Sequence, residues 1–272
     1  MHDVVGAHAA GASAEDTHDA GEAEDTAEGD AEAAPAEGDH AESEVPHWSY
    51  AGDTGPDHWG ELEADYALCA TGEAQSPVLL IAGTEEDIPD IVFNYAASPL
   101  TLADNGHSVE VSVEPGSSIE IDGVTYTLLQ YHFHAPSEHA INGVFYPMEM
   151  HLVHQAEDGT LAVVGVMIDL GDASEAYAPF FDALADVSTA AQTVEGVSIN
   201  PADLLPAEPV AYRYAGSLTT PPCSEGVVWS VLANPVTASA EQIAAFEALY
   251  DGNARPIQPG NERAIVLDTT ID

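Results

Sequence analysis

The chain of 272 residues has no lysine and only three arginines, against 48 acidic residues. The formal net charge of −45 argues against binding to nucleic acid, which needs basic side chains to displace phosphate counterions. It argues equally against binding to anionic membrane surfaces. Charge of this size produces self-repulsion, which molar salt screens because the Debye length then falls to about 3 Å. The composition therefore predicts an acidic, halophile-like protein whose stability rises with salt.

Long apolar runs and cysteines are also scarce. No stretch approaches the roughly 18 apolar residues that a transmembrane helix needs, so none is expected. The N-terminus lacks the basic start and apolar core of a secretory signal peptide. Cys69 and Cys223 are the only cysteines. In an exported protein such a pair indicates one disulfide, and the alternative is two buried thiols.

The first 45 residues contain fourteen acids and no basic or aromatic residue. Such a segment buries too little apolar surface to offset the entropy of ordering. Residues 1–45 are therefore predicted to be a disordered acidic tail, and residues 46–272 to form one ordered domain. Weak, diffuse cation binding by the tail carboxylates is possible, whereas a dedicated Ca²⁺ loop is not seen. Its scattered histidines, interpreted as solvated rather than metal-gathering, are His2, His8, His18 and His40.

Strand-forming segments outnumber helical ones in the rest of the chain. Ser239, with Gln242 three residues later, forms a capping box that predicts a helix ending near Tyr250. A second helix is expected over residues 173–186. Runs of aliphatic and aromatic residues, separated by turn residues such as those at 157–160, predict strands. These strands cover residues 125–133, 145–154, 161–168 and 226–233.

Three histidines in two of these segments indicate a metal site. His132 and His134 are two residues apart, so on a strand they share one face with Gln130. His151 shares a face with Glu149 in the same way. If the two strands pair, three imidazoles converge, and three protein ligands leave the fourth zinc position open for chemistry. Gln130 and Glu149 are placed to bind the second ring nitrogens of the ligands.

Two further histidines, His139 and His154, lie near these segments but are offset from the ligand pattern. They are interpreted as structural or surface residues. A single His-x-His pair is a weak indication of metal binding. The third histidine, with polar partners at the i−2 positions, strengthens the prediction.

Several short motifs occur in order along about residues 46–268. They are His47-Trp-Ser-Tyr50, Gln75-Ser-Pro77, Asn105-Gly-His107, the histidine segments 130–139 and 148–154, Ser217-Leu-Thr-Thr-Pro-Pro222 and Asn253-Ala-Arg-Pro256. With these motifs the sequence resembles an α-class carbonic anhydrase of the bacterial type.

This resemblance implies a fold and a reaction. The expected fold is mainly β (α+β), with a large, mostly antiparallel, twisted central sheet and short peripheral helices. The expected reaction is reversible hydration of CO2 to bicarbonate and a proton by zinc-bound hydroxide, with Zn²⁺ held by His132, His134 and His151. The backbone carbonyl of Asn253 would hold His134. The pair Cys69–Cys223 would be a disulfide, which places the protein in an extracellular or periplasmic compartment.

The resemblance also assigns catalytic roles. Thr219 would accept a hydrogen bond from the hydroxide and pass one to Glu138, and Thr220 would line the same pocket. His107 would shuttle protons. The apolar wall that receives CO2 would consist of Val153, Val163, Leu218 and Trp229.

Alternatives remain at this stage. His107 could simply belong to an Asp104–His107 turn, and Thr219–Pro222 could be only a rigid turn. The domain could be a non-catalytic binding module on the same fold. The chain could also be a mineral-associated protein, in which the acidic tail binds Ca²⁺ while the domain makes bicarbonate. Retention of all three histidines, Glu138 and Thr219 favours the enzyme. A homodimer is possible where salt or an apolar interface overcomes the charge.

Overall fold

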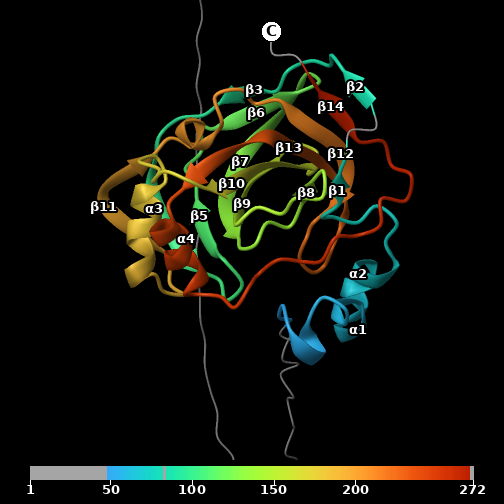
Figure 1. Ribbon diagram of the computed structural model, residues 1–272, viewed down its shortest axis with the longest axis horizontal. Helices are drawn as coiled ribbons and strands as arrows, with labels where there is room; N and C mark the ends of the chain where they lie inside the picture. The colour runs from blue at the N-terminus through green and yellow to red at the C-terminus, as the bar shows by residue number, and fades with distance from the viewer. Residues whose placement is uncertain (1–47, 82–83, 270–272) are drawn as a thin grey trace, which may run out of the picture. The chain divides into compact units, whose positions relative to one another are not determined.

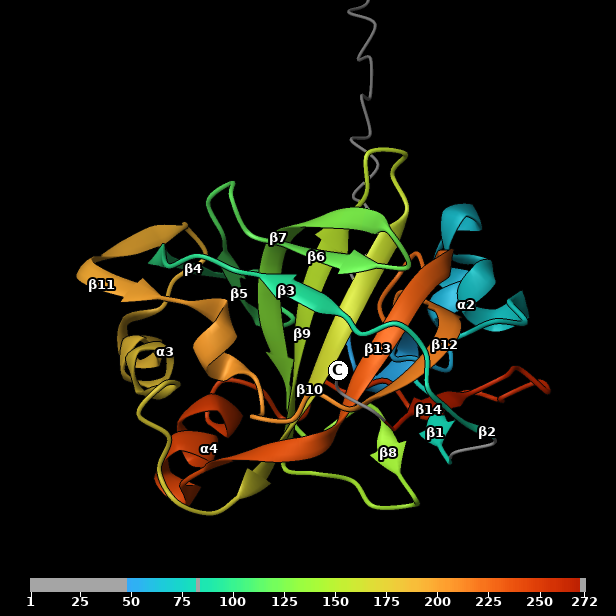
Figure 2. The same ribbon diagram turned by 90° about the horizontal axis from the view of Figure 1, so that it is seen from above.

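The computed structural model describes residues 48–81 and 84–269. The acidic tail predicted over 1–45, with its four histidines, lies outside these residues, as does His47 of the first motif. In the described part, twelve strands form one large twisted sheet (Figures 1 and 2). They are β2 (Thr84–Glu86), β3 (Val92–Asn94), β4 (Ser98–Asp104), β5 (Val109–Ser112), β6 (Ser118–Ile121), β7 (Val124–His134), β9 (Met148–Gln155), β10 (Leu161–Leu170), β11 (Gln192–Ile199), β12 (Ala211–Ser217), β13 (Glu225–Ala238) and β14 (Val266–Asp268).

The strand order is β11-β4-β5-β7-β9-β10-β13-β12-β14-β2, and β6 pairs with both β3 and β7 at one side of this path. Among these described strands the pairings are antiparallel except β10–β13 and β14–β2. A separate parallel pair joins β1 (Leu79–Leu80) to β8 (Ala140–Ile141). The predicted mostly antiparallel central sheet is therefore confirmed.

The helices are short and peripheral, as expected. They are α1 (Trp59–Leu62), α2 (Leu68–Thr71), α3 (Ala178–Ala183) and α4 (Ala240–Glu247), with 3₁₀ turns at Gly52–Thr54, Ala64–Tyr66, Leu184–Asp186 and Pro201–Leu204. Figure 2 shows α3 and α4 at the β11 end of the sheet, and Figure 1 shows α1 and α2 together at the lower right, away from α3 and α4. The capping box is present, with the Ser239 hydroxyl accepting from the Gln242 N–H and the Gln242 amide oxygen accepting from the Ser239 N–H.

The other predicted helix, over 173–186, is too long. In the structure α3 begins at Ala178 and continues only as the 3₁₀ turn Leu184–Asp186. Pro179 explains the late start, because proline lacks the N–H that an earlier turn would need and is tolerated only in the first turn of a helix.

A β-bulge in β7 decides which residues reach the site. The register with β9 shifts between Leu128 and Gln130, so Leu129 is the extra residue. Beyond the bulge, Tyr131 and Phe133 enter the larger core cluster, where Phe133 stacks on Phe180 of α3 with ring centroids 4.1 Å apart. The alternate residues of the strand therefore face the other side of the sheet.

Candidate active site

The paired strands β7 and β9 bring the three predicted ligands together. His132 lies directly opposite His151 in the ladder, and His134 lies opposite Glu149. The ring centroids are 5.4 Å apart for His132 and His151, 5.1 Å for His132 and His134, and 4.6 Å for His134 and His151. One nitrogen from each ring lies within 4.8 Å of the others. The convergence predicted from the sequence is confirmed.

The second nitrogen of each ring is held by a neighbour. His132 Nδ1 donates to the Gln130 amide oxygen at 2.8 Å, and His134 Nδ1 donates to the carbonyl of Asn253 at 2.7 Å. His151 uses Nε2 instead, which contacts Glu149 Oε1 at 2.8 Å. The nitrogens left for a metal are thus Nε2 of His132, Nε2 of His134 and Nδ1 of His151.

These free nitrogens suit zinc. His134 Nε2 is buried and has no hydrogen-bond partner, a costly arrangement unless a ligand completes it. Burial lowers the pKa of all three histidines, that of His134 to about 4. The imidazoles are therefore neutral near pH 7, which is the form that binds a metal.

Glu149 is the centre of a hydrogen-bond network that the sequence only partly predicted. Its Oε1 accepts from His139 Nδ1 at 2.7 Å as well as from His151, and its Oε2 accepts from the backbone N–H groups of Glu138 and His139 at 2.9 and 2.8 Å. Burial alone would raise the pKa of this carboxyl, but the neighbouring His139 and His151 lower it well below its usual range. His139 Nε2 contacts the Tyr214 hydroxyl at 2.7 Å, which makes His139 a structural residue.

Gly165 of β10 pairs with His151. A larger residue at this position would fit only if neighbouring side chains moved. A Cβ at this position would lie 3.0 Å from Glu149 Oε1 and 3.3 Å from a methyl group of Val231. Since Glu149 is fixed by its four donors, the glycine provides the space in which this carboxylate sits.

Glu138 is fully buried, and its Oε1 accepts the backbone N–H of Arg255 at 2.8 Å. Burial raises the pKa of this carboxyl to about 7, although His151, the Arg255 N–H and the Thr219 hydroxyl each lower it. Thr219 is buried and Thr220 half-buried in the turn after β12, which is closed by a bond from the Cys223 N–H to the Thr220 carbonyl at 2.9 Å. The structure thus brings Glu138 and Thr219 together beside the histidines.

Comparison with known proteins agrees with this geometry. A family model described as "Eukaryotic-type carbonic anhydrase" matches residues 54–269. The chain belongs to this family. It is 40% identical over 231 residues to a carbonic anhydrase of Nostoc sp., covering 83% of this chain and 88% of the relative. It is 42% identical over 222 residues to one of Pectobacterium carotovorum, covering 81% and 90%.

A solved structure of a hyperthermostable carbonic anhydrase, identified from an active hydrothermal vent chimney, has a TM-score of 0.78 and 43% identity. The match covers 81% of this chain and 99% of that one. The predicted resemblance to bacterial α-class enzymes is therefore confirmed. As a carbonic anhydrase, the protein is a zinc enzyme of CO2 hydration, and its histidine triad fits that metal.

The predicted apolar wall of this carbonic anhydrase forms a row next to the histidines. Gln130, Val153, Val163 and Trp229 are successive partners across β7, β9, β10 and β13. Val153 and Leu218 pack against the cluster that contains Val163 and Trp229. The Trp229 ring centroid lies 4.9 Å from that of His151, and its Nε1 donates to the Ser217 carbonyl at 2.9 Å.

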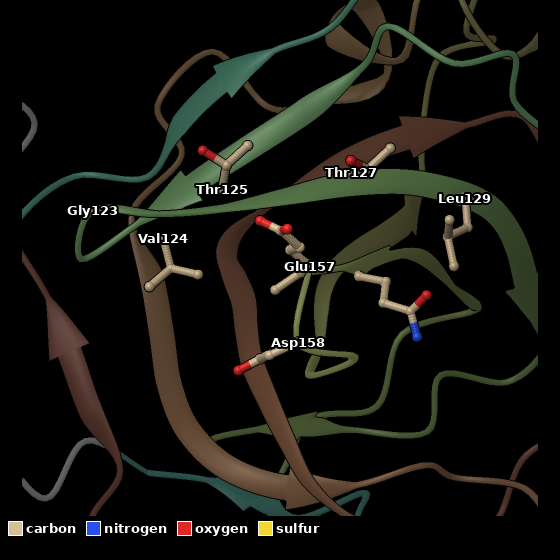
Figure 3. A pocket seen from close by; sticks show the side chains of 9 residues that line it. Gly123, Val124, Thr125, Thr127, Leu129, Glu157 and Asp158 are labelled. Atoms are coloured by element: carbon tan, nitrogen blue, oxygen red, sulfur yellow. The ribbon is translucent and has the colours of Figure 1, made fainter.

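Two residues beyond Val153 in β9, and on the same face of the sheet, Gln155 pairs with Thr127 of β7. Both residues line a hollow of about 780 Å³ that also involves Leu129 and the acidic turn residues Glu157 and Asp158 (Figure 3). The hollow begins where the bulged Leu129 leaves the ladder. The face that carries the histidines therefore continues into this hollow through Thr127 and Gln155.

His107 lies in the predicted turn, with its N–H bonded to the Asn105 side-chain oxygen at 2.9 Å. Its ring is half-buried and stacks on Trp48, with centroids 3.5 Å apart and planes within 10°. The Asn253 side-chain amide donates to the His107 carbonyl at 3.0 Å. Asn253 therefore holds both the turn of His107 and the ligand His134.

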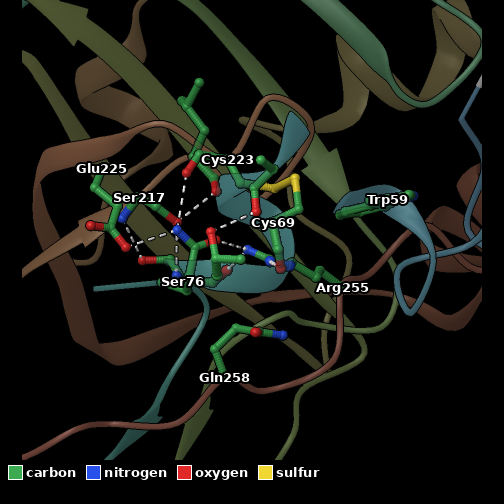
Figure 4. Close-up of a disulfide and its surroundings, with 12 residues drawn as sticks. Trp59, Cys69, Ser76, Ser217, Cys223, Glu225, Arg255 and Gln258 are labelled. Atoms are coloured by element: carbon green, nitrogen blue, oxygen red, sulfur yellow. Dashed lines mark hydrogen bonds between the residues drawn. A yellow bond between two sulfur atoms is a disulfide. The ribbon is translucent and has the colours of Figure 1, made fainter. Parts of the chain in front are cut away.

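The predicted disulfide is present. Cys69 and Cys223 are bonded, with Cα atoms 5.1 Å apart across 154 positions of sequence. Figure 4 shows the bond beside Arg255 and Trp59. Of the helices in the described residues, none combines the length and apolar character that crossing a membrane requires.

Proposed function

We propose that the zinc held by His132, His134 and His151 serves reversible hydration of CO2 to bicarbonate, with a defined role for each side chain around it. The observation that carries the proposal is the convergence of three neutral imidazole nitrogens whose other nitrogens are already held by Gln130, Glu149 and Asn253. When bound, zinc lowers the pKa of water to about 7, a magnitude for which carbonic anhydrase is the standard example.

Thr219 and Glu138 orient the attacking oxygen. Glu138 Oε1 is satisfied by the Arg255 N–H, while its Oε2 is buried without a partner of hydrogen-bonding geometry. The Thr219 hydroxyl, which lowers the pKa of this carboxyl, is the donor that we assign to Oε2. A hydroxyl that gives its only proton to a carboxylate keeps its lone pairs for the attacking group. Thr220 lines the same pocket.

The row of Val153, Val163 and Trp229, with Leu218 beside it, receives CO2. A small apolar molecule gains from contact with an apolar surface, and the product bicarbonate is charged and does not. The wall therefore favours substrate over product at the position next to the histidines. This difference promotes release of the product after the reaction.

His107 carries protons between the site and the solvent. Direct release of a proton from a group of pKa 7 is limited by diffusion to about 10³ per second, whereas turnover near 10⁶ per second, again the standard value for carbonic anhydrase, needs a relay. An imidazole with an ordinary pKa near 6.5 suits that task. The half-buried position of His107 against Trp48 supports the role.

The shuttle is tested with His107→Ala in weak buffer. We expect maximal turnover to fall about tenfold or more and to recover when a concentrated imidazole buffer replaces the missing group. The value of kcat/KM for CO2 should change little. The exposed His58→Ala provides the matched control. Unchanged turnover of His107→Ala in weak buffer would leave the residue as a turn histidine only.

The zinc requirement is tested by stopped-flow measurement of CO2 hydration in 2 M NaCl, before and after removal of zinc by a chelator. Fast hydration should disappear with zinc and return when it is added back. The variant His132→Ala should not recover under the same conditions, because one ligand is missing. Slow hydration in a folded, zinc-loaded sample would overturn the proposal and favour a non-catalytic binding module.

An extracellular or periplasmic location is supported by the disulfide. Such bonds persist in oxidising compartments, and reduction is the rule in the cytosol. Recovery of the protein in the cytosolic fraction, with both thiols free, would contradict this location.

A further inference from the structure

The three arginines of this chain all bond to acceptors within the fold, Arg213 and Arg255 from buried positions, and two of the three meet at one residue. Arg255 Nη1 donates to the Gln75 side-chain oxygen at 2.9 Å, and Arg263 Nη2 donates to the Gln75 backbone carbonyl at 2.7 Å. Arg213 forms an ion pair with Asp268 at 3.0 Å. Two of the only three arginines of the chain therefore share Gln75 as a partner.

Arg255 is unusual because its buried guanidinium contacts neutral acceptors. Its Nη1 also donates to the Ser76 carbonyl at 2.7 Å, its Nη2 donates to the Cys69 carbonyl at 2.9 Å, and the group lies over the Trp59 ring at 5.6 Å. The residue is 2% exposed. Burial of this charge is unfavourable and lowers the pKa of the guanidinium, and the charge of Glu138 offsets this only in part. Its planar fork, by contrast, is suited to fixing several acceptors at once.

The backbone of the same residue faces the catalytic groups. The Arg255 N–H is bonded to Glu138 Oε1, and two residues earlier the Asn253 carbonyl holds His134. A segment of three residues therefore touches both a metal ligand and the carboxyl that orients the attacking oxygen. The guanidinium fastens this segment to α2, which contains Cys69, and to Gln75 and Ser76.

Gln75 extends the cluster to the other catalytic group. Its side-chain amide donates to the Cys223 carbonyl at 3.0 Å, and the Cys223 N–H closes the turn that carries Thr219 and Thr220. The Cys69–Cys223 bond joins α2, which contains Cys69, to the turn that carries Thr219 and Thr220. Figure 4 shows Cys69, Cys223 and Arg255 close together. Arg255, Gln75 and the disulfide thus form a closed ring of contacts behind Glu138 and Thr219.

We propose that Arg255 is a positioning residue for the reaction, which sets the geometry of Glu138 through its own backbone and that of Thr219 through Gln75 and the disulfide. The inference rests on the roles proposed above for Glu138 and Thr219. Arg255 touches neither substrate nor metal, and it acts by fixing where the oxygen of Glu138 and the hydroxyl of Thr219 meet.

The test is a double-mutant cycle on the zinc-loaded, full-length protein. Arg255→Lys keeps the charge but replaces the planar fork, which spans the Gln75, Ser76 and Cys69 acceptors, with a compact ammonium. We expect kcat/KM for CO2 to fall about tenfold or more, as is usual when a residue that supports a catalytic group is changed. Because Arg255 acts through Glu138, the same substitution should cost little further activity in the Glu138→Gln background. Arg213→Lys, at the buried arginine paired with Asp268, is the matched control and should retain activity.

A second readout is independent of turnover. In the cobalt-substituted protein, a displaced Glu138 carboxylate changes the field at the metal, so Arg255→Lys should shift the pH midpoint of the visible spectrum. Arg213→Lys should not. If Arg255→Lys fails to fold, Gln75→Met replaces it in the cycle, because it leaves the guanidinium its two carbonyl acceptors while removing the bond to Cys223.

The outcomes are distinct. Losses that simply add across the cycle, or an equal loss in Arg213→Lys, would show that Arg255 is only structural and would overturn the inference. If Glu138→Gln alone retains full activity, the role proposed for Glu138 fails and the inference fails with it. A zinc-loaded wild-type protein without hydration activity would instead overturn the proposed function.

Discussion

At the scale of single residues, His154 makes the stability of the fold depend on pH without a part in catalysis. Its Nδ1 donates to the Ala162 carbonyl at 3.3 Å, so its Nε2 accepts from the Tyr95 hydroxyl at 2.8 Å. The two rings are also stacked. Burial lowers the pKa of His154 to about 4, and the residue is therefore neutral in the folded protein at neutral pH.

This pKa predicts acid destabilisation in a defined range. The unfolded chain binds the proton near pH 6.5 and the folded one only near pH 4, so stability is lost as the pH falls through this interval. The loss is of the order of 3 kcal/mol. Urea unfolding between pH 7 and pH 4.5 should show a smaller slope for His154→Gln than for the wild type, and the exposed His58→Gln should not differ. Parallel pH curves for wild type and His154→Gln would contradict the assignment.

The ligand set could be predicted from the sequence because its pattern is local. His132 and His134 follow the two-residue period of a strand, and His132 and His151 each have a polar partner two positions earlier, Gln130 and Glu149. The contacts that hold His139 and Glu138 in place could not be predicted in the same way. His139 is bonded to Tyr214, and Glu138 to Arg255, across long separations in the chain. No periodicity encodes such contacts, and they become visible only in the folded structure.

At the scale of elements, the positions of the strands could be predicted from composition. Which side chains share a face of the sheet could be predicted only in part. The predicted strand over 125–133 is β7, yet the bulge at Leu129 reverses the alternation within it. Strict alternation along the whole strand would put Thr127 and His132 on opposite faces. In the structure Thr127 and His132 pair with Gln155 and His151, so both lie on the site face. An extra residue in a ladder depends on the pairing with a neighbouring strand, which the sequence of β7 does not determine.

At the scale of the whole molecule, few of the acidic side chains in the part of the chain that the structure describes are buried. Among the described residues, only Glu138, Glu149 and Asp268 are buried acids, and the two glutamates belong to the active site. The three arginines offset little of the net charge of −45. The remaining carboxylates repel one another across water, where salt screens the interaction. We therefore expect the fold to gain stability when the ionic strength rises.

We expect the acidic side chains to make the free energy of unfolding depend on salt. Between 0.1 M and 2 M NaCl we expect the free energy of unfolding to increase, and each kcal/mol gained raises Tm by about 2–4 °C for a domain of this size. Neutralising four exposed glutamates, Glu85, Glu86, Glu114 and Glu120, by substitution with Gln should raise Tm at 0.1 M NaCl and change it little at 2 M. The matched Glu→Asp set keeps the charge and should retain the salt dependence of the wild type. Because screening acts only on charge, a Tm that is equal at both salt concentrations would mean that surface repulsion does not limit the stability of this fold.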